Sequence, residues 1–169
     1  MRFFNWILVS GLMALTMSCG YHFEGGGYLN TDLRRVAVSA FENKSSETGA
    51  GMMFTNALIE EISRKTDTQV VDASLAGHVI RATIQSVTFS TLSRSSTTSV
   101  TERRVTAVVD LSIRDGENEA VWSVKGFSSS EDYTVSSNTV TDDSNRQAAL
   151  DKIAMRSAER LVSRMLNNF

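Results

Sequence analysis

The chain has 169 residues, of which 41% are hydrophobic, 21% charged and 8% aromatic, proportions typical of a folded globular protein. Its 17 basic and 19 acidic side chains give a formal charge of -2, which speaks against general nucleic-acid binding because that function needs a basic excess. A single cysteine excludes an internal disulfide and a cysteine-rich metal site, and two histidines leave little for a histidine-based one. We therefore expect one domain without a cofactor or metal.

The first 18 residues have the pattern of an export signal. A positive start at Arg2 precedes an apolar run from Phe3 to Met17, which is too short for a transmembrane helix. The run ends in a small residue followed by Cys19, and this arrangement resembles a bacterial lipoprotein signal, in which the cysteine is lipidated and becomes the first mature residue. Tyr21, not an aspartate, lies close after the cysteine, which in enterobacterial-type sorting implies the outer membrane. The alternative is an ordinary cleaved signal that leaves a free thiol.

After the signal, residues 19–32 form a lipidated N-terminus and a short glycine-containing tether, and residues 33–169 form a single domain. Alternating hydrophobicity predicts a strand from Leu33 to Phe41. Apolar residues at helical spacing predict an amphipathic helix from Gly49 to Thr66, and a second short strand follows from Thr68 to Val71. A strand, helix and strand in this order imply a right-handed crossover and a parallel pair.

Three long antiparallel strands are predicted next, over His78 to Thr91, Thr101 to Arg114 and Ala120 to Tyr133. Asp115-Gly116 favours a hairpin turn between the last two, since glycine tolerates a positive φ. In the first long strand the apolar residues change from one face to the other, which indicates either a β-bulge near Gln85 or a strand that leaves the main core there.

The chain ends in a long predicted helix. Thr134 to Asp143 has little apolar content and is predicted to be a loop, and Asp142 to Ser144 offer helix N-terminal chemistry. The helix is expected from about Asn145 to Leu166. Its buried stripe should contain Leu150, Ile153, Ala154, Ser157, Ala158, Leu161, Val162 and Met165. The fold class is therefore α+β, a two-layer sandwich with two helices on one face of a mixed four- to five-stranded sheet.

These pieces resemble one family. Cys19-Gly20-Tyr21-His22-Phe23 is similar to the mature start of the lipopolysaccharide-assembly lipoprotein family LptE. Val36 to Asn43 and Phe54 to Glu61 resemble that family's first strand and helix, and the later element order fits as well. The resemblance covers nearly the whole mature chain.

The resemblance implies a non-enzymatic role at the periplasmic face of the outer membrane. LptE-like proteins bind LptD, a large outer-membrane β-barrel, sit partly inside it as a plug, and help lipopolysaccharide reach the outer leaflet. The family also binds lipopolysaccharide through basic residues near the tip of the long strands and in the loop before the last helix. Arg94 falls at the first of these positions, whereas Ser136 to Ser144 contains no lysine or arginine.

Further basic residues are candidates for contact with lipopolysaccharide or the barrel. Arg103 and Arg104 follow the hydroxyl-rich tip, Ser90 to Thr101, and their guanidinium groups suit phosphate, but adjacent strand residues point to opposite faces and cannot both line one site. The last helix carries basic residues four apart, which form either a solvated face or a contact for a partner's acidic groups: Lys152, Arg156, Arg160 and Arg164.

The sequence contains no nucleophile elbow, paired-histidine motif or phosphate loop, so we expect no enzyme. An alternative function is activation of a peptidoglycan synthase by a periplasm-facing lipoprotein of the LpoB and TolB-like group. That group shares the Val-Ala-Val start and a motif like Phe41-Glu42-Asn43, but it usually has a long linker after its cysteine. Here only about a dozen residues separate Cys19 from the first strand.

Overall fold

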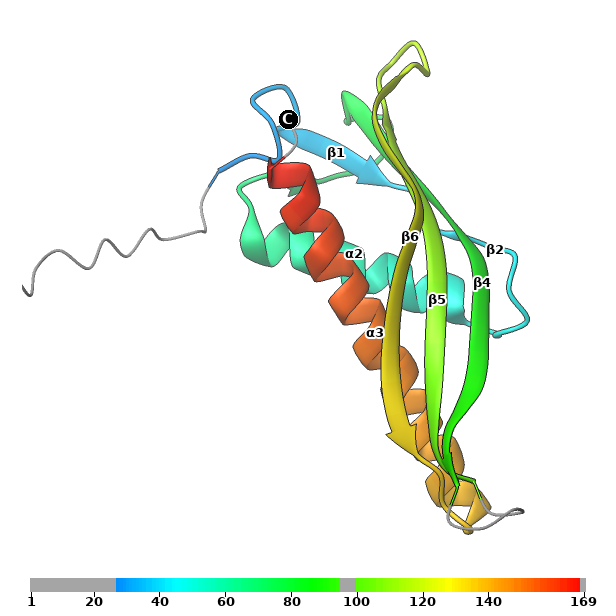
Figure 1. The fold of residues 1–169 in the computed structure, drawn as a ribbon. Helices are drawn as coiled ribbons and strands as arrows, with labels where there is room; N and C mark the ends of the chain where they lie inside the picture. Colours follow the sequence, from blue (N-terminus) through cyan, green and yellow to red (C-terminus); the bar gives the residue numbers. More distant parts are fainter. Residues whose placement is uncertain (1–26, 95–99, 168–169) are drawn as a thin grey trace, which may run out of the picture.

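The computed structural model describes residues 27–94 and 100–167, so Cys19 and the signal segment lie outside the described residues. Figure 1 shows a sheet with two helices beside it. The elements are β1 (Arg35–Val38), β2 (Glu42–Asn43), α2 (Ala50–Lys65), β3 (Gln69–Val70), β4 (His78–Arg94), β5 (Val100–Arg114), β6 (Ala120–Thr134) and α3 (Thr139–Asn167).

The sheet is mixed, as predicted. Its strands follow the order β3-β1-β4-β5-β6, and β2 joins it by pairing with β4. β1 is parallel to both β3 and β4, and α2 makes the crossover between β1 and β3. The pairs β4–β5 and β5–β6 are antiparallel. The short strand β2 was not expected from the sequence, because its two residues, Glu42 and Asn43, are polar and exposed.

Both helices share one core with the sheet. Phe54, Leu58 and Ile62 of α2 are almost fully buried in the same cluster as Ile80 and Ile113 of the strands. The predicted stripe of α3 is confirmed, since all of its residues are buried: Leu150, Ile153, Ala154, Ser157, Ala158, Leu161, Val162 and Met165. The predicted fold class, two helices on one face of a mixed sheet, is therefore confirmed.

Two bulges bend the three long strands at the same level. Ile84 pairs with Val109 and Ser86 with Val108, which leaves Gln85 as the extra residue of β4 and confirms the predicted bulge. A second register shift, between Val109 and Leu111, places an extra residue in β6 beside Gly126. Gly126 has φ of +64°, a conformation that glycine adopts without a steric penalty. The bulges divide β4, β5 and β6 into two halves.

One half of these strands, called here the narrow half, runs from the bulges to the β4–β5 tip. In Figure 1 it forms the slender end of the molecule together with the first turns of α3. The C-terminal end of α3 and the first described residues lie toward the opposite, wider end, where β1 and β3 join the sheet. The molecule therefore tapers away from the end at which the described chain begins.

The start of α3 corrects the prediction. The helix begins at Thr139 rather than near Asn145, and Asn138 supplies the cap by accepting a hydrogen bond from the backbone N–H of Thr141 at 3.1 Å. Asp142 lies in the first turn and accepts the backbone N–H of Ser136 at 3.0 Å. The early turns were missed because Thr139 to Asp143 are polar or exposed and so show no helical hydrophobic period.

Candidate functional site

The predicted contact residues lie at three different places around the narrow half. Arg94 is the last residue of β4, where it is exposed and pairs in register with Val100. Arg103 points to the helix side of the sheet, opposite Tyr133, whereas Arg104 points to the outer side. The structure therefore does not bring the three arginines together. For Arg103 and Arg104 this separation was predicted, because adjacent strand residues point to opposite faces. Cys19, the predicted lipidation site, lies outside the described residues.

Arg104 is engaged in an ion pair within the sheet. Its Nε and a terminal nitrogen donate to the two carboxylate oxygens of Asp132, at 2.7 and 2.9 Å. These hydrogen bonds, together with the opposite charge, raise the pKa of Arg104 and lower the pKa of Asp132. The sequence did not indicate this partner, which lies 28 residues away.

The side of the narrow half that faces away from the helices carries small hydroxyl side chains. We call this surface the outer sheet face. It consists of the three rows nearest the bulges across β4, β5 and β6: Ser86–Val108–Ser128, Thr88–Thr106–Ser130 and Ser90–Arg104–Asp132. The next row toward the tip, Ser93–Glu102–Thr134, carries the exposed carboxylate of Glu102 and is not counted in this face. Six of the nine side chains are serine or threonine, one is valine, and the two charged ones neutralise each other.

Asp110 joins the two bulges at the border of this face. One oxygen of its carboxylate accepts a hydrogen bond from Nε2 of Gln85 at 2.8 Å, and the other accepts the backbone N–H of Gly126 at 2.6 Å. One side chain of the central strand, β5, therefore bonds to the bulge in β4 and to the bulge in β6. The bend that separates the narrow half from the rest of the sheet is fixed by these two hydrogen bonds.

The opposite surface, called here the helix layer, exposes long charged side chains of α2 and α3. An open groove of about 470 Å³ crosses it, lined by Ala57, Glu60, Glu61, Arg64, Glu131, Lys152, Met155, Arg156 and Glu159. Glu61 is buried and bonds to Arg64, whose pKa this hydrogen bond raises. Charged side chains dominate this lining, unlike the mostly apolar walls of small-molecule sites.

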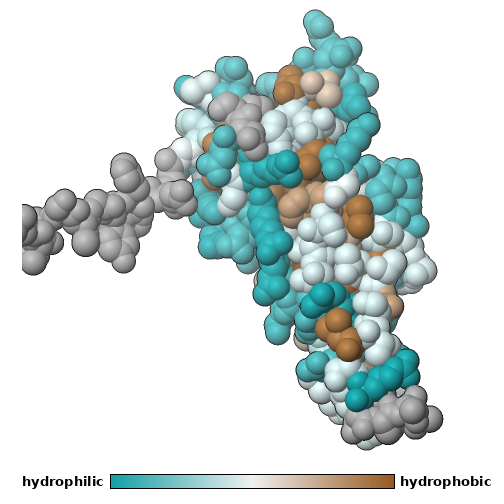
Figure 2. All heavy atoms as spheres, viewed as in Figure 1, coloured by the Kyte–Doolittle hydropathy of each residue, from teal (hydrophilic) through white to brown (hydrophobic). Residues whose placement is uncertain are grey.

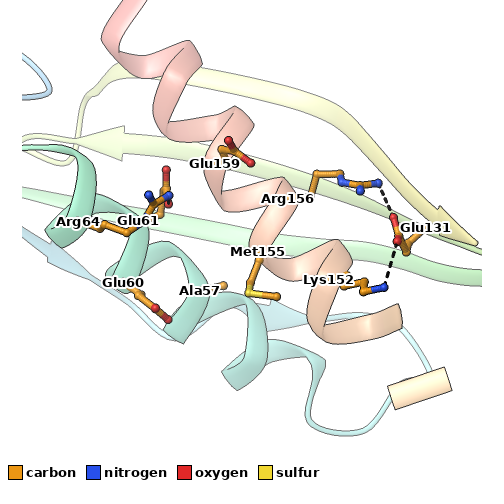
Figure 3. Close-up of a pocket in the computed structure, with 9 residues that line it drawn as sticks. All are labelled: Ala57, Glu60, Glu61, Arg64, Glu131, Lys152, Met155, Arg156 and Glu159. Carbon is orange, nitrogen blue, oxygen red and sulfur yellow. Dashed lines mark hydrogen bonds and ion pairs between the residues drawn. The ribbon is translucent and has the colours of Figure 1, made fainter. Parts of the chain in front are cut away.

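The basic stripe of α3 is partly used inside the molecule. Arg156 bonds to Glu131 of β6, and Lys152 lies 3.9 Å from the same carboxylate, as Figure 3 shows. Only 13% of the Glu131 side chain is exposed, so two cations compensate a carboxylate that is largely removed from water. Lys152 and Arg156 therefore pair within the molecule while their side chains stay 61% and 46% exposed, so the solvated face and the partner contact both remain predictions for this stripe.

A second unpredicted cluster ties the narrow half to the loop before α2. Arg146 of α3 bonds to Glu47, and its guanidinium lies over the ring of Phe89, 4.8 Å from the ring centre. Phe89 in turn packs edge-on against Tyr133, with 6.4 Å between ring centres. Arg146 lies two residues beyond Ser136 to Ser144, the loop in which the family resemblance implies a basic side chain. Its partner, Glu47, is 99 residues away in the chain.

The described residues contain neither a metal-binding cluster nor a membrane-spanning helix. No group of three or more histidine, cysteine, aspartate or glutamate side chains able to hold a metal occurs in residues 27–94 and 100–167. Neither α2 nor α3 is long and apolar enough to cross a membrane. In Figure 2 the narrow end is mostly hydrophilic or intermediate, with isolated hydrophobic residues.

The described residues form a tapered α+β sandwich, with two helices on one face of a mixed sheet. The model of the LptE family, described as lipopolysaccharide-assembly, matches residues 33–165. The chain therefore belongs to the LptE family, as its N-terminal motif and element order predicted. The coarse functional prediction, a lipopolysaccharide-assembly lipoprotein, is confirmed at the level of the family. No match was found among curated proteins.

Solved structures of several lipoproteins share the fold. A putative lipoprotein from Caulobacter crescentus superposes with a TM-score of 0.61 at 12% identity, covering 82% of this chain and 93% of that one. An uncharacterized lipoprotein B from Nitrosomonas europaea gives 0.58 at 16% identity, covering 85% and 88%. The rare lipoprotein B from Shewanella oneidensis gives 0.53 at 18% identity, covering 79% and 94%. At these identities the likeness concerns the fold alone.

Proposed function

We propose that this chain is a lipid-anchored lipoprotein of the outer membrane that binds and plugs an LptD-like β-barrel from the periplasmic side. In this role it assists the assembly of the barrel and the delivery of lipopolysaccharide to the outer leaflet. The observation that carries the proposal is the match of the LptE family to residues 33–165. No covalent chemistry is required of the protein.

The shape of the molecule supports the proposal. The narrow half extends away from the wide end, toward which the first described residues lie (Figure 1). Seven residues, 20–26, separate Cys19, the expected lipid anchor, from the described body, so the anchor lies at most about 28 Å from Gly27. An anchor of several acyl chains at Cys19 holds far more firmly than a single one. The body is thus kept within reach of the periplasmic mouth of a barrel.

The surface chemistry also agrees with insertion into a barrel. The interior of an outer-membrane barrel is polar, so a segment that enters it must remain compatible with a polar wall and water. The outer sheet face meets this condition through its serine and threonine side chains. A hydrophobic end would instead favour contact with acyl chains.

We assign contact with lipopolysaccharide or the barrel wall first to Arg94. It is exposed at the end of β4, and a guanidinium group can hold a phosphate by two hydrogen bonds. Arg103 and Arg104 remain secondary candidates. Arg104 must first exchange Asp132 for the new partner, since its donors already bond to that carboxylate. Arg103 points toward the helix side and is half-buried.

The decisive experiment is affinity purification of the full-length lipoprotein from detergent-solubilised envelopes, with identification of what copurifies. We expect a large LptD-like barrel in near-equal amounts. Recovery of a peptidoglycan synthase in its place would support the alternative function.

The anchor is tested separately. Cys19→Ala should release the protein from membranes, and mass spectrometry of the wild-type N-terminal peptide should find an acylated Cys19. An unmodified thiol at this position would refute the lipid anchor.

A further inference from the structure

The outer sheet face differs from an ordinary solvated surface because it has few long charged side chains. A chain with 21% charged residues places only one ion pair among these nine positions, none of which is lysine or glutamate. The exposed Glu102 lies in the next row toward the tip. Long flexible side chains lose rotamer freedom when a partner immobilises them, whereas serine, threonine and valine lose little. The face can therefore be covered closely at a small entropic cost.

The same nine side chains exclude several kinds of partner. They carry no net charge, since Arg104 and Asp132 neutralise each other, so they offer no attraction to phosphate groups. They include no aromatic ring for stacking on a sugar and only one apolar side chain, Val108, for contact with acyl chains. What remains is a surface of hydroxyl groups, each of which can donate and accept a hydrogen bond. Such a surface suits an uncharged polar protein wall, whether that wall presents hydrogen-bond donors or acceptors.

The position of the face narrows the choice further. All three rows lie beyond the bulges at Gln85 and Gly126, on the part of the sheet that extends away from the wide end (Figure 1). Asp110 bonds to both bulges and so holds the bend from which the narrow half extends. Across the same strands the helix layer exposes Lys152, Arg156 and Glu159, which suit water rather than close packing.

We infer that the outer sheet face is the surface that lies directly against the polar inner wall of the barrel, and that the helix layer faces the water of the lumen. The inference rests on the proposed function and adds to it an orientation. It commits Ser86, Thr88, Thr106, Ser128 and Ser130 to contact with the wall. The ion pair of Arg104 and Asp132 enters the interface as a neutral unit.

Site-specific photo-crosslinking tests this orientation in the full lipoprotein, coproduced with the LptD-like barrel of the same cell. A photoreactive residue is introduced at Thr88 or Ser130 on the outer sheet face. The matched controls carry it at Gln147 or Asp151, which are exposed on the first half of α3. We expect adducts with the barrel from the two sheet positions, at least about tenfold more abundant than from the two helix positions.

Each other outcome overturns the orientation in a distinct way. Stronger adducts from Gln147 or Asp151 would reverse the orientation and leave the plug intact. An adduct of twice the mass of this chain from Thr88 would make the face an interface between two copies. An adduct with lipopolysaccharide would show that lipid covers it. If the unmodified lipoprotein recovers no barrel at all, the proposed function fails first.

Charged substitutions give an independent measurement. Thr106→Lys and Ser130→Lys place a long cation against the wall, where it loses its water without gaining a partner, so barrel recovery should fall about tenfold or more. Gln147→Lys is the control and should recover the barrel as the wild type does. An unchanged thermal midpoint in all three variants shows that the fold is retained. Full barrel recovery by both sheet variants would refute the inference while leaving the plug function standing.

Discussion

The helix layer and the outer sheet face rest on the same hydrophobic core but expose opposite kinds of side chain. The helix layer presents long charged groups, some of which form ion pairs within α2 or between α3 and β6. The outer sheet face presents short hydroxyls and one closed ion pair. Under the proposed function, we attribute this difference to what each surface contacts. Long charged side chains favour water, whereas short polar ones permit a close partner.

The largest expected effect comes from breaking the core on which both surfaces rest. Ile153 of α3 is fully buried, so Ile153→Ala should lower the free energy of unfolding by about 2 to 5 kcal/mol. Met155 is 54% exposed on the same helix, and Met155→Ala should change it by less than about 0.5 kcal/mol. Chemical denaturation of both variants measures the difference. Similar losses from the two would contradict the assignment of the buried face.

The second prediction compares an arginine at the end of the sheet with one on the helix layer. A charge-assisted hydrogen bond contributes about 1.5 to 3 kcal/mol, so Arg94→Glu should weaken lipopolysaccharide binding roughly tenfold to a hundredfold. Arg160→Glu, at an exposed position of α3, should leave binding unchanged. Arg156 is unsuited as a control because it bonds to Glu131.

Titration of the purified variants with lipopolysaccharide measures binding. Their thermal midpoints show whether a loss of binding comes from a lost contact or from a destabilised fold. Equal binding by Arg94→Glu and the wild type would remove the lipid contact. The protein would then serve the barrel alone.

The third prediction concerns the bend that separates the narrow half from the rest of the sheet. Asp110→Ala leaves Nε2 of Gln85 and the N–H of Gly126 without their acceptor, and should lower the free energy of unfolding by about 1 to 2 kcal/mol. Asp151→Ala removes an exposed carboxylate from α3 and should be nearly neutral. Hydrogen exchange at Gly126 should accelerate in the first variant only. Unaltered protection there would show that Asp110 does not hold the bend.

The sequence predicted those parts of the fold that depend on local patterns. The alternation of β5 and the helical stripe of α3 identified the buried faces, and the change of face after Ile84 located the bulge at Gln85. β2 and the first turns of α3 were not predicted, because they are polar or exposed and show no hydrophobic periodicity. The sequence offered one indirect signal for the true start of α3, since Asn138 is a favoured capping residue.

The candidate surfaces were less predictable because they depend on pairing between distant residues. Strand alternation predicted that Arg103 and Arg104 point to opposite faces, but the bond of Arg104 to Asp132 follows only from the register of β5 and β6. The same holds for the two cations on Glu131 and for Arg146 with Glu47. The bond of Asp110 to both bulges requires Gln85 and Gly126 to lie at one level. A pattern in one strand does not contain that information.

The smallest predicted effect is a pH dependence on the outer sheet face. Hydrogen bonds from Arg104 lower the pKa of Asp132 in the folded protein, so the pair stabilises the fold above the pKa of the unfolded chain, about 4. This contribution is lost as the pH falls through the lowered pKa and the carboxylate takes up a proton. The Asp132→Asn variant lacks this contribution at every pH, because it has no carboxylate at this position. The thermal midpoint of the wild type should therefore exceed that of Asp132→Asn slightly at pH 7, and the two should converge below about pH 4. Because the other carboxylates titrate in both proteins, the difference isolates this pair, and high salt should reduce it. A difference that stays constant down to pH 2 would mean that the ion pair does not contribute, and that Arg104 is available to another acidic group.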